Sequence, residues 1–339
     1  MSTKLSIQEI RSLPKIDLHR HLDCSMRWST MLEIAATLKL DFPRNIADQA
    51  DYFLVTQPMK NLAQVLNKFT VAQKLLASVE ILERLAFEVC EDAFNDGVRI
   101  LELRYAPTFI AEGHPHLTYQ DIHSAFLKGI SKAKRHFPIA VGLICILQRT
   151  LPYEKVEKVT EFAIENKASF LAIDLADNED GFEPARFAPL FEKARLSGLN
   201  ITVHSGEAPS PNAHKWLRDS IKILGAQRIG HGVQSIHFPE IVQLLKEKNI
   251  ALEICPYSNY LTQAFPSLKD NPIKKLKELG VAVTINSDDP GMFASVLSDD
   301  YLILQDEHHF MKKDFLDCNQ NAFEHSFIPL EEKQKVWST

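Results

Sequence analysis

The sequence has few cysteines, little net charge and no long apolar run, and each of these absences excludes a class of protein. Five cysteines occur among 339 residues, without a Cys-x-x-Cys pair, so neither a disulfide framework nor a thiolate zinc site is expected. Any metal must then be held by histidine and carboxylate. The formal net charge of -6 gives no general attraction to nucleic acid or to an anionic membrane, so neither is predicted as a partner.

Targeting and membrane-spanning segments are also lacking. No apolar run approaches the roughly 18 residues that cross a bilayer, and residues 1–11 show no basic segment followed by an apolar one. We therefore predict a cytoplasmic protein. The apolar content of 45% and the charged content of 24% are typical of a globular fold, and this balance suits a small neutral substrate. The oligomeric state does not follow from the sequence.

What the chain does contain is a regular alternation of apolar strands and helix-length segments. The opening strand at 15–23 is followed by strand candidates at 98–107, 139–147, 169–176, 200–208, 227–233, 250–256 and 281–290. Near-continuously apolar strands separated by helical segments favour a parallel sheet covered by helices. Eight such units predict an α/β fold of the (β/α)8 TIM-barrel type, with additional helices, as in metal-dependent hydrolases.

We expect one domain over residues 1–339, with an N-terminal arm at 1–14 and C-terminal helices from about residue 301 packed outside the barrel. No linker or low-complexity segment divides the chain. The region between the first two strands is mostly helical in pattern. Four apolar residues share one helix face there, which indicates either core packing or a lid over a pocket: Leu62, Val65, Leu66 and Phe69.

Unusual polar residues fall at the C-terminal ends of the predicted strands, where the active sites of such barrels lie. They come from four strands: His19 and His21, then His204 and Glu207, then His231, then Asp288 and Asp289. In an ideal strand His19 and His21 point to the same face, so both could reach one metal ion. A catalytic zinc site needs about three protein ligands. Barrel closure would bring the others to this pair.

Each of these residues also has a purely structural explanation. A single histidine at a strand end is commonly a partly buried, hydrogen-bonded residue. Asp288 and Asp289 could form a turn before Pro290. Glu207 could open the following helix, where a carboxylate favours the helix dipole. Their coincidence at one end of a barrel is what favours a site.

Five short motifs occur in a fixed order along the chain. They are His19-Arg20-His21-Leu22-Asp23, His204-Ser205-Gly206-Glu207, Arg228-Ile229-Gly230-His231-Gly232, Cys255-Pro256-Tyr257-Ser258-Asn259 and Asn286-Ser287-Asp288-Asp289-Pro290. Their order, spacing and identity resemble the adenosine deaminase family, within the amidohydrolase superfamily, from about residue 14 to residue 335. Five motifs in register are far more specific than any one of them.

The resemblance implies one Zn²⁺ per chain with four protein ligands: His19, His21, His204 and Asp288. It assigns His231 and Asp289 to orienting and deprotonating a water molecule, and Glu207 to protonating N1 of the purine. Zinc can lower the pKa of water to about 7. Protonation of N1 weakens the C6–N1 double bond, so that water adds at C6 and ammonia leaves. Glu207 must hold a proton when the purine binds, so burial should raise its pKa.

Asp23 is the best indication of the substrate. In the family that this chain resembles, an aspartate at this place accepts a hydrogen bond from a ribose 5′-hydroxyl, whereas adenine-specific relatives carry glutamate. The resemblance therefore favours a nucleoside, and a 5′-phosphate would meet like-charge repulsion from Asp23. The apolar face at residues 62–69 falls where the family builds a lid over the nucleoside. By strand alternation Arg20 points away from the histidines.

Asp177 departs from the family pattern, which has glycine there with its backbone close to the purine N3 edge. The side chain could clash, tilt the purine or recognise another group. Smaller departures at Cys24, Ser205 and Ser287 leave the chemistry in place. We predict zinc-dependent deamination of adenosine or 2′-deoxyadenosine, with adenine or a 5′-modified adenine nucleoside as the alternative substrate. A non-catalytic barrel that only binds a ligand is the third hypothesis.

Overall fold

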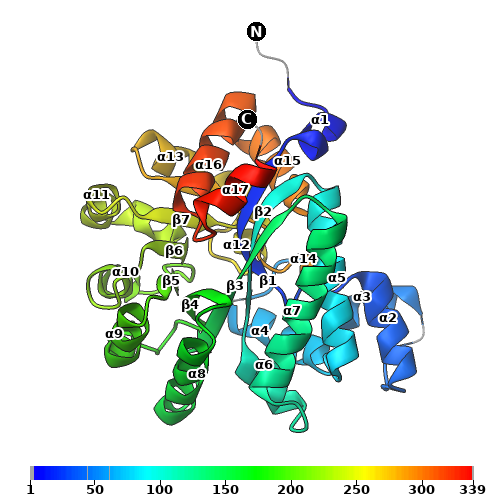
Figure 1. The fold of residues 1–339 in the computed structure, drawn as a ribbon. Helices are drawn as coiled ribbons and strands as arrows, with labels where there is room; N and C mark the ends of the chain where they lie inside the picture. Colours follow the sequence, from blue (N-terminus) through cyan, green and yellow to red (C-terminus); the bar gives the residue numbers. More distant parts are fainter. Residues whose placement is uncertain (1–3, 44, 61, 338–339) are drawn as a thin grey trace.

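The protein folds around one eight-stranded parallel sheet. Residues 4–43, 45–60 and 62–337 are described in a computed structural model (Figure 1). The strands follow one another around the sheet in chain order: β1 (Lys15–His21), β2 (Val98–Tyr105), β3 (Ala140–Gln148), β4 (Phe170–Ala176), β5 (Asn200–Ser205), β6 (Arg228–His231), β7 (Ala251–Ile254) and β8 (Val283–Ile285). The predicted (β/α)8 barrel is confirmed.

The seam between β8 and β1 lies just beyond the end of β8. There the backbone N–H of His21 donates to the carbonyl of Asp288 at 2.8 Å, and the N–H of Asp288 donates to the carbonyl of His19 at 2.9 Å. These bonds form the bridge between Arg20 and Asp288. The closure of the barrel thus falls among residues that the sequence singles out for chemistry.

Helices lie around the outside of the sheet and at its ends (Figure 1). The α-helices are α1 (Ile7–Ser12), α2 (Trp28–Thr37), α3 (Ile46–Phe53), α4 (Leu62–Gln73), α5 (Val79–Asn95), α6 (Pro107–Gly113), α7 (Tyr119–His136), α8 (Tyr153–Glu165), α9 (Ala188–Leu196), α10 (Ala213–Lys222), α11 (Pro239–Glu247), α12 (Pro256–Leu261), α13 (Ile273–Glu278), α14 (Pro290–Phe293), α15 (Leu297–His308), α16 (Lys312–His325) and α17 (Leu330–Val336). Short 3₁₀ helices are η1 (Pro184–Phe187), η2 (Val233–His237) and η3 (Leu268–Asp270). No helix among the described residues is long and apolar enough to cross a membrane.

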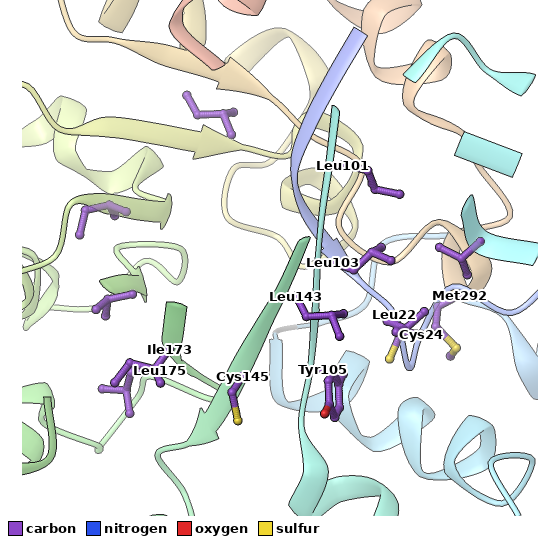
Figure 2. Close-up of a cluster of buried hydrophobic side chains, with 14 of the residues drawn as sticks. Leu22, Cys24, Leu101, Leu103, Tyr105, Leu143, Cys145, Ile173, Leu175 and Met292 are labelled. Atoms are coloured by element: carbon purple, nitrogen blue, oxygen red, sulfur yellow. The ribbon is translucent and has the colours of Figure 1, made fainter. Parts of the chain in front are cut away.

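Alternation along the strands separates an apolar outer layer from a polar barrel interior. On β2, Leu101, Leu103 and Tyr105 belong to the core between sheet and helices (Figure 2). Their neighbours Glu102 and Arg104 are fully buried and make ion pairs with residues of other strands. Because burying a leucine stabilises a fold by about 1.5–3 kcal/mol, the outer layer supports the fold and leaves the interior free to carry charge.

The C-terminal helices also reach the N-terminal end of the barrel. Ala322 of α16 and Ile328 pack with Ile16 and Leu18 of β1 in a separate apolar cluster. The backbone N–H of Phe327 donates to the Glu102 carboxylate at 2.6 Å. This segment therefore shields the N-terminal end of the barrel from water, while the C-terminal end carries the polar residues that the sequence singles out.

Candidate active site

Three histidines and one aspartate converge at the C-terminal end of the barrel, from β1, β5 and the segment after β8. The Asp288 Oδ1 atom lies 3.2 Å from His19 Nε2 and 3.3 Å from His21 Nε2. The Nε2 atoms of His21 and His204 are 3.3 Å apart. The sequence-predicted convergence of distant strand ends is therefore present in the structure.

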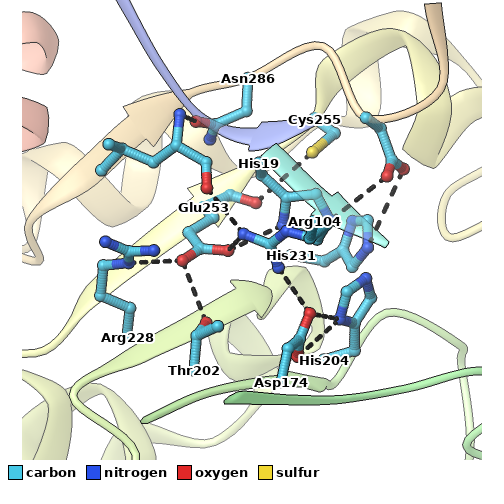
Figure 3. Close-up of polar contacts among 12 residues, drawn as sticks. His19, Arg104, Asp174, Thr202, His204, Arg228, His231, Glu253, Cys255 and Asn286 are labelled. Atoms are coloured by element: carbon cyan, nitrogen blue, oxygen red, sulfur yellow. Dashed lines mark hydrogen bonds and ion pairs between the residues drawn. The ribbon is translucent and has the colours of Figure 1, made fainter. Parts of the chain in front are cut away.

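Two buried carboxylates set the orientation of the imidazoles (Figure 3). Glu253 lies 2.8 Å from His19 Nδ1, and Asp174 lies 3.0 Å from His204 Nδ1. A carboxylate accepts the Nδ1–H, so each Nε2 presents a lone pair to the cluster. The Nε2 of His19 is buried without a hydrogen-bond partner among the described residues.

The spacing of these donor atoms tests whether they fit a metal ion. Ligands about 2.0–2.1 Å from a tetrahedral ion lie roughly 3.4 Å from one another. The separations of 3.2 to 3.3 Å between the Nε2 and Oδ1 atoms agree with that value. Facing lone pairs repel unless a cation lies between them. The cluster can therefore hold one metal ion, with imidazole and carboxylate donors of the kind that zinc prefers.

Arg104 of β2 links the two orienting carboxylates. Its Nη1 donates to Asp174 at 2.8 Å, and its Nη2 donates to Glu253 at 2.8 Å (Figure 3). The Nε of Arg228 donates to the second Glu253 oxygen at 2.6 Å. Burial raises the pKa of Glu253, but the positive charges of Arg104 and Arg228 outweigh it and hold that pKa well below its ordinary value. Both carboxylates are thus kept ionised behind the histidines.

Sequence reasoning assigned no role to Arg104, Asp174, Arg228 or Glu253. The available signal was charge inside an apolar strand, as in the run Val98–Tyr105, which contains a glutamate and two arginines. That signal shows where a charge is buried, but it does not show which partner on another strand will meet it.

Glu207 lies after β5 and faces His231 across the site, with 3.7 Å between its Oε2 and the Nε2 of His231. Burial, together with the negative charges of Asp288 and Glu179, raises the pKa of Glu207 to about 8. The carboxyl group therefore holds a proton at neutral pH. This agrees with the raised pKa that the sequence predicted.

Glu179, which sequence reasoning missed, holds the loop that carries Glu207. Its Oε2 accepts a hydrogen bond from Gly206 N at 2.9 Å, and its Oε1 accepts one from Ala208 N at 2.6 Å. Gly206 has a φ of 68°, and an added Cβ would lie 2.8 Å from the Leu217 side chain. The residues on both sides of Glu207 are thus fixed by one buried carboxylate.

His231 and Asp288 both have left-handed backbone conformations, with φ of 60° and 62°. Such residues are uncommon outside glycine and cluster at functional sites. The Nδ1 of His231 lies 2.9 Å from the Asn259 side-chain amide, and the Ser258 hydroxyl donates to Asp288 Oδ2 at 2.6 Å. The Cys-Pro-Tyr-Ser-Asn motif thus orients two of the predicted site residues.

Asp289 is buried beside Asp288. Burial raises the pKa of Asp289 well above its ordinary value, and the Asp288 charge acts in the same direction. One oxygen, Oδ1, has no hydrogen-bond partner among the described residues. Asp289 therefore carries an unused acceptor at the edge of the polar cluster.

One cavity joins the polar cluster to the apolar face of α4. Its lining includes most of the predicted residues: His21, Leu62, Val65, Leu66, Phe69, Asp177, His204, Glu207, His231, Asp288 and Asp289. Only about 50 Å³ of space remains inside it. Val65 also belongs to the hydrophobic core, so this helix face packs inward and covers the polar residues at once.

Asp23 and Asp177 are placed differently from each other. Asp177 lines the cavity with a φ of 81°, and its Oδ2 accepts hydrogen bonds from Thr150 Oγ1 at 2.6 Å and Gln148 Nε2 at 3.2 Å. Asp23 is not among the residues that line the cavity. Its Oδ2 accepts from Ala106 N at 3.0 Å, its Oδ1 is unpartnered, and burial raises its pKa to about 7.

Comparisons with known proteins show what the chain as a whole is similar to. A family model described as adenosine deaminase matches residues 14–339. An adenosine deaminase from Plasmodium falciparum is 34% identical over 333 residues, covering 97% of this chain and 89% of the relative. An N6-methyl-AMP deaminase structure from Arabidopsis thaliana superposes with a TM-score of 0.82 at 27% identity, covering 98% of this chain and 97% of the other. An adenine deaminase structure from Arthrobacter aurescens has a TM-score of 0.88 at 21% identity, covering 96% and 97%.

Proposed function

Because the chain belongs to the adenosine deaminase family, we propose that it deaminates adenosine or 2′-deoxyadenosine by hydrolysis. The products are inosine or 2′-deoxyinosine and ammonia. The observation that carries this proposal is the meeting of three imidazole nitrogens and one carboxylate oxygen opposite a buried, protonated Glu207. A site built for binding alone does not require a carboxyl group that is kept neutral.

The residues that would hold one Zn²⁺ are His19, His21, His204 and Asp288. Their donor spacing and the unpartnered Nε2 of His19 support this assignment. When bound, zinc supplies a Lewis acid that lowers the pKa of water to about 7. The carboxylates behind His19 and His204 orient these imidazoles before metal binds.

The remaining residues move and hold protons. Glu207 donates its proton to N1 of the purine, which lowers the electron density at C6 and opens that carbon to attack by water. His231 and Asp289 accept hydrogen bonds from the attacking water and receive its proton. Return of a proton to the exocyclic nitrogen lets ammonia leave from the tetrahedral C6. Acid catalysis of this kind typically contributes about 10² to 10⁴ in rate.

Access to the site requires movement of α4. The space of about 50 Å³ under its apolar face is far smaller than a purine nucleoside. We infer that α4 acts as a lid, because its residues Leu62, Leu66 and Phe69 are only partly buried where they cover the cavity. Asp177 lines the same cavity, and this position supports the proposal that it discriminates among 6-aminopurines.

A second substrate class follows from the same position of Asp177. Its carboxylate is tied to Thr150 and Gln148, in a backbone conformation that favours glycine. A side chain retained under such strain favours recognition of a polar group on the substrate. Adenine or a 5′-modified adenine nucleoside is therefore the alternative, with Asp23 lying outside the cavity lining.

The test is ultraviolet absorbance during incubation of zinc-replete protein with adenosine, 2′-deoxyadenosine, adenine and N6-methyl-AMP. We expect turnover of the two nucleosides, with equimolar release of ammonia, and loss of turnover in Glu207→Gln. Turnover of adenine or N6-methyl-AMP alone would replace the nucleoside assignment. Absence of turnover on all four substrates, with zinc bound, would refute the proposed reaction.

A further inference from the structure

Arg20 is a buried cation with no acidic partner at close range. It stands between His19 and His21, is 5% exposed, and its side chain lines a different cavity from the one that His21 lines. Its Nε donates to Ser25 Oγ at 3.2 Å. Across the described residues, no carboxylate oxygen lies within 4 Å of its guanidinium, and its two Nη atoms have no hydrogen-bond acceptor.

The cavity beside Arg20 lies outside the barrel, along the seam between β1 and the segment after β8. Its volume is about 480 Å³, and it is lined by residues of α1, α5, α14 and the segment that leaves β1. Gly291 of α14 lies so close to this segment that an added Cβ would be 2.6 Å from the backbone of Met26. Backbone contact of this kind makes the inner wall of the cavity rigid.

The acidic groups around the cavity already have partners. Both carboxylate oxygens of Asp92 accept from Arg27, the shorter contact being 2.7 Å. The Oδ2 of Asp96 accepts from Ser298 N at 2.9 Å, and its charge faces Lys15. Arg11, on the exposed rim, adds a further positive charge. The charge that acts most strongly on Arg20 is that of Asp17, which is hydrogen-bonded to Ser287 and makes no ion pair with the guanidinium. Unlike Arg27, the buried Arg20 therefore has no ion-pair partner among the described residues.

A buried charge without an ion-pair partner is costly, because desolvation of an ion in a protein costs several kcal/mol unless a partner repays it. A guanidinium presents a planar fork of donors that matches the two oxygens of a carboxylate or a phosphate. We propose that this cavity is a second binding site, separate from the active site, for a small oxyanion that pairs with Arg20.

The occupant is a monovalent oxyanion rather than a nucleotide polyphosphate. Two aspartates line the cavity with three arginines, so a multiply charged ligand would meet repulsion from Asp92 and Asp96.

The proposed anion site is connected to the active site through a hydrogen-bonded serine. Ser25 Oγ, which accepts from Arg20, donates to the backbone carbonyl of His21 at 2.5 Å.

The test is isothermal titration calorimetry of the metal-loaded protein with acetate and with formate, two monovalent oxyanions, at constant ionic strength. We expect saturable binding of one anion per chain, weakened at least about tenfold in Arg20→Met, as for loss of a charge-assisted pair. Arg195→Gln removes an exposed arginine remote from the cavity and should bind both anions as the wild type does.

Charge changes at the rim separate this site from anion binding at the metal centre. Asn95 lines the cavity, is exposed, and is the last residue of α5. We expect Asn95→Asp to weaken anion binding and Asn95→Lys to tighten it, each by about threefold through the changed local potential. These surface variants keep the test decisive if Arg20→Met does not fold. No saturable binding to the wild type, or equal affinity in both Asn95 variants, would overturn the proposal.

Discussion

The buried acid Glu207 allows one prediction to be worked out in free energy. Its pKa rises from the ordinary value of 4.5 to about 8, mainly through burial. At about 1.4 kcal/mol per pKa unit, ionising it in the folded protein costs about 5 kcal/mol more than in the unfolded chain. Replacement by glutamine keeps the shape of the side chain and removes the ionisation.

The sign follows from proton binding. Between pH 4.5 and 8 the folded protein keeps the Glu207 proton that the unfolded chain releases, so the stability of the wild type falls as pH rises. The free energy of unfolding of Glu207→Gln relative to wild type should therefore rise from pH 5 to pH 8 by about 3.5 kcal/mol, most of the full difference. Below pH 4.5 Glu207 is protonated in both the folded and the unfolded chain. The pH-dependent part of the stability difference between the two proteins is therefore absent there.

The assay is urea denaturation of both proteins at pH 5, 6, 7 and 8, with and without bound metal. A bound dication favours the ionised carboxylate and should reduce the difference. Glu157→Gln, which changes an exposed glutamate of α8, is the matched control and should alter stability little at any pH. A difference between Glu207→Gln and wild type that stays constant from pH 5 to pH 8 would refute the reasoning.

Three further predictions concern the groups around the acid. Glu179→Gln should lower kcat more than it changes KM and move the basic limb of the pH–rate profile to lower pH, because its charge helps to raise the pKa of Glu207; an unchanged profile would contradict this. Arg104→Met should destabilise the fold by about 3–5 kcal/mol and weaken metal affinity about 10- to 100-fold, measured by denaturation and metal competition, because it leaves Asp174 and Glu253 uncompensated. Asp177→Gly should relieve strain at its φ of 81° and alter the KM ratio between adenosine and adenine; equal ratios would exclude a role in selectivity.

Strand ends were the least accurate part of the sequence prediction. The strand expected at 98–107 ends at Tyr105, because Pro107 occupies the first turn of α6. The strand expected at 200–208 ends at Ser205, before the left-handed Gly206. The strand expected at 281–290 is only Val283–Ile285. In each case a turn or a helix start replaces regular strand geometry where functional side chains must be aimed.

Local sequence patterns were sufficient to predict the barrel and the polar residues at the C-terminal ends of its strands. Eight apolar runs of strand length specify a parallel sheet, and polar residues at their C-terminal ends must meet once the sheet closes. Alternation also placed Arg20 away from His19 and His21, and the structure puts its side chain in another cavity. These inferences need only local periodicity and the topology of the fold.

The pairing of the buried charges, in contrast, depends on the tertiary structure. Arg104, Asp174 and Glu253 come from β2, β4 and β7, which are not all neighbours in the sheet, and meet because the barrel interior brings their side chains together. The alternation of residues along a strand predicts that a side chain points into the barrel. Which charged residue it pairs with depends on the register between strands and on the closure of the barrel. The same holds for Glu179, whose two backbone contacts beside Glu207 join segments that share no sequence pattern.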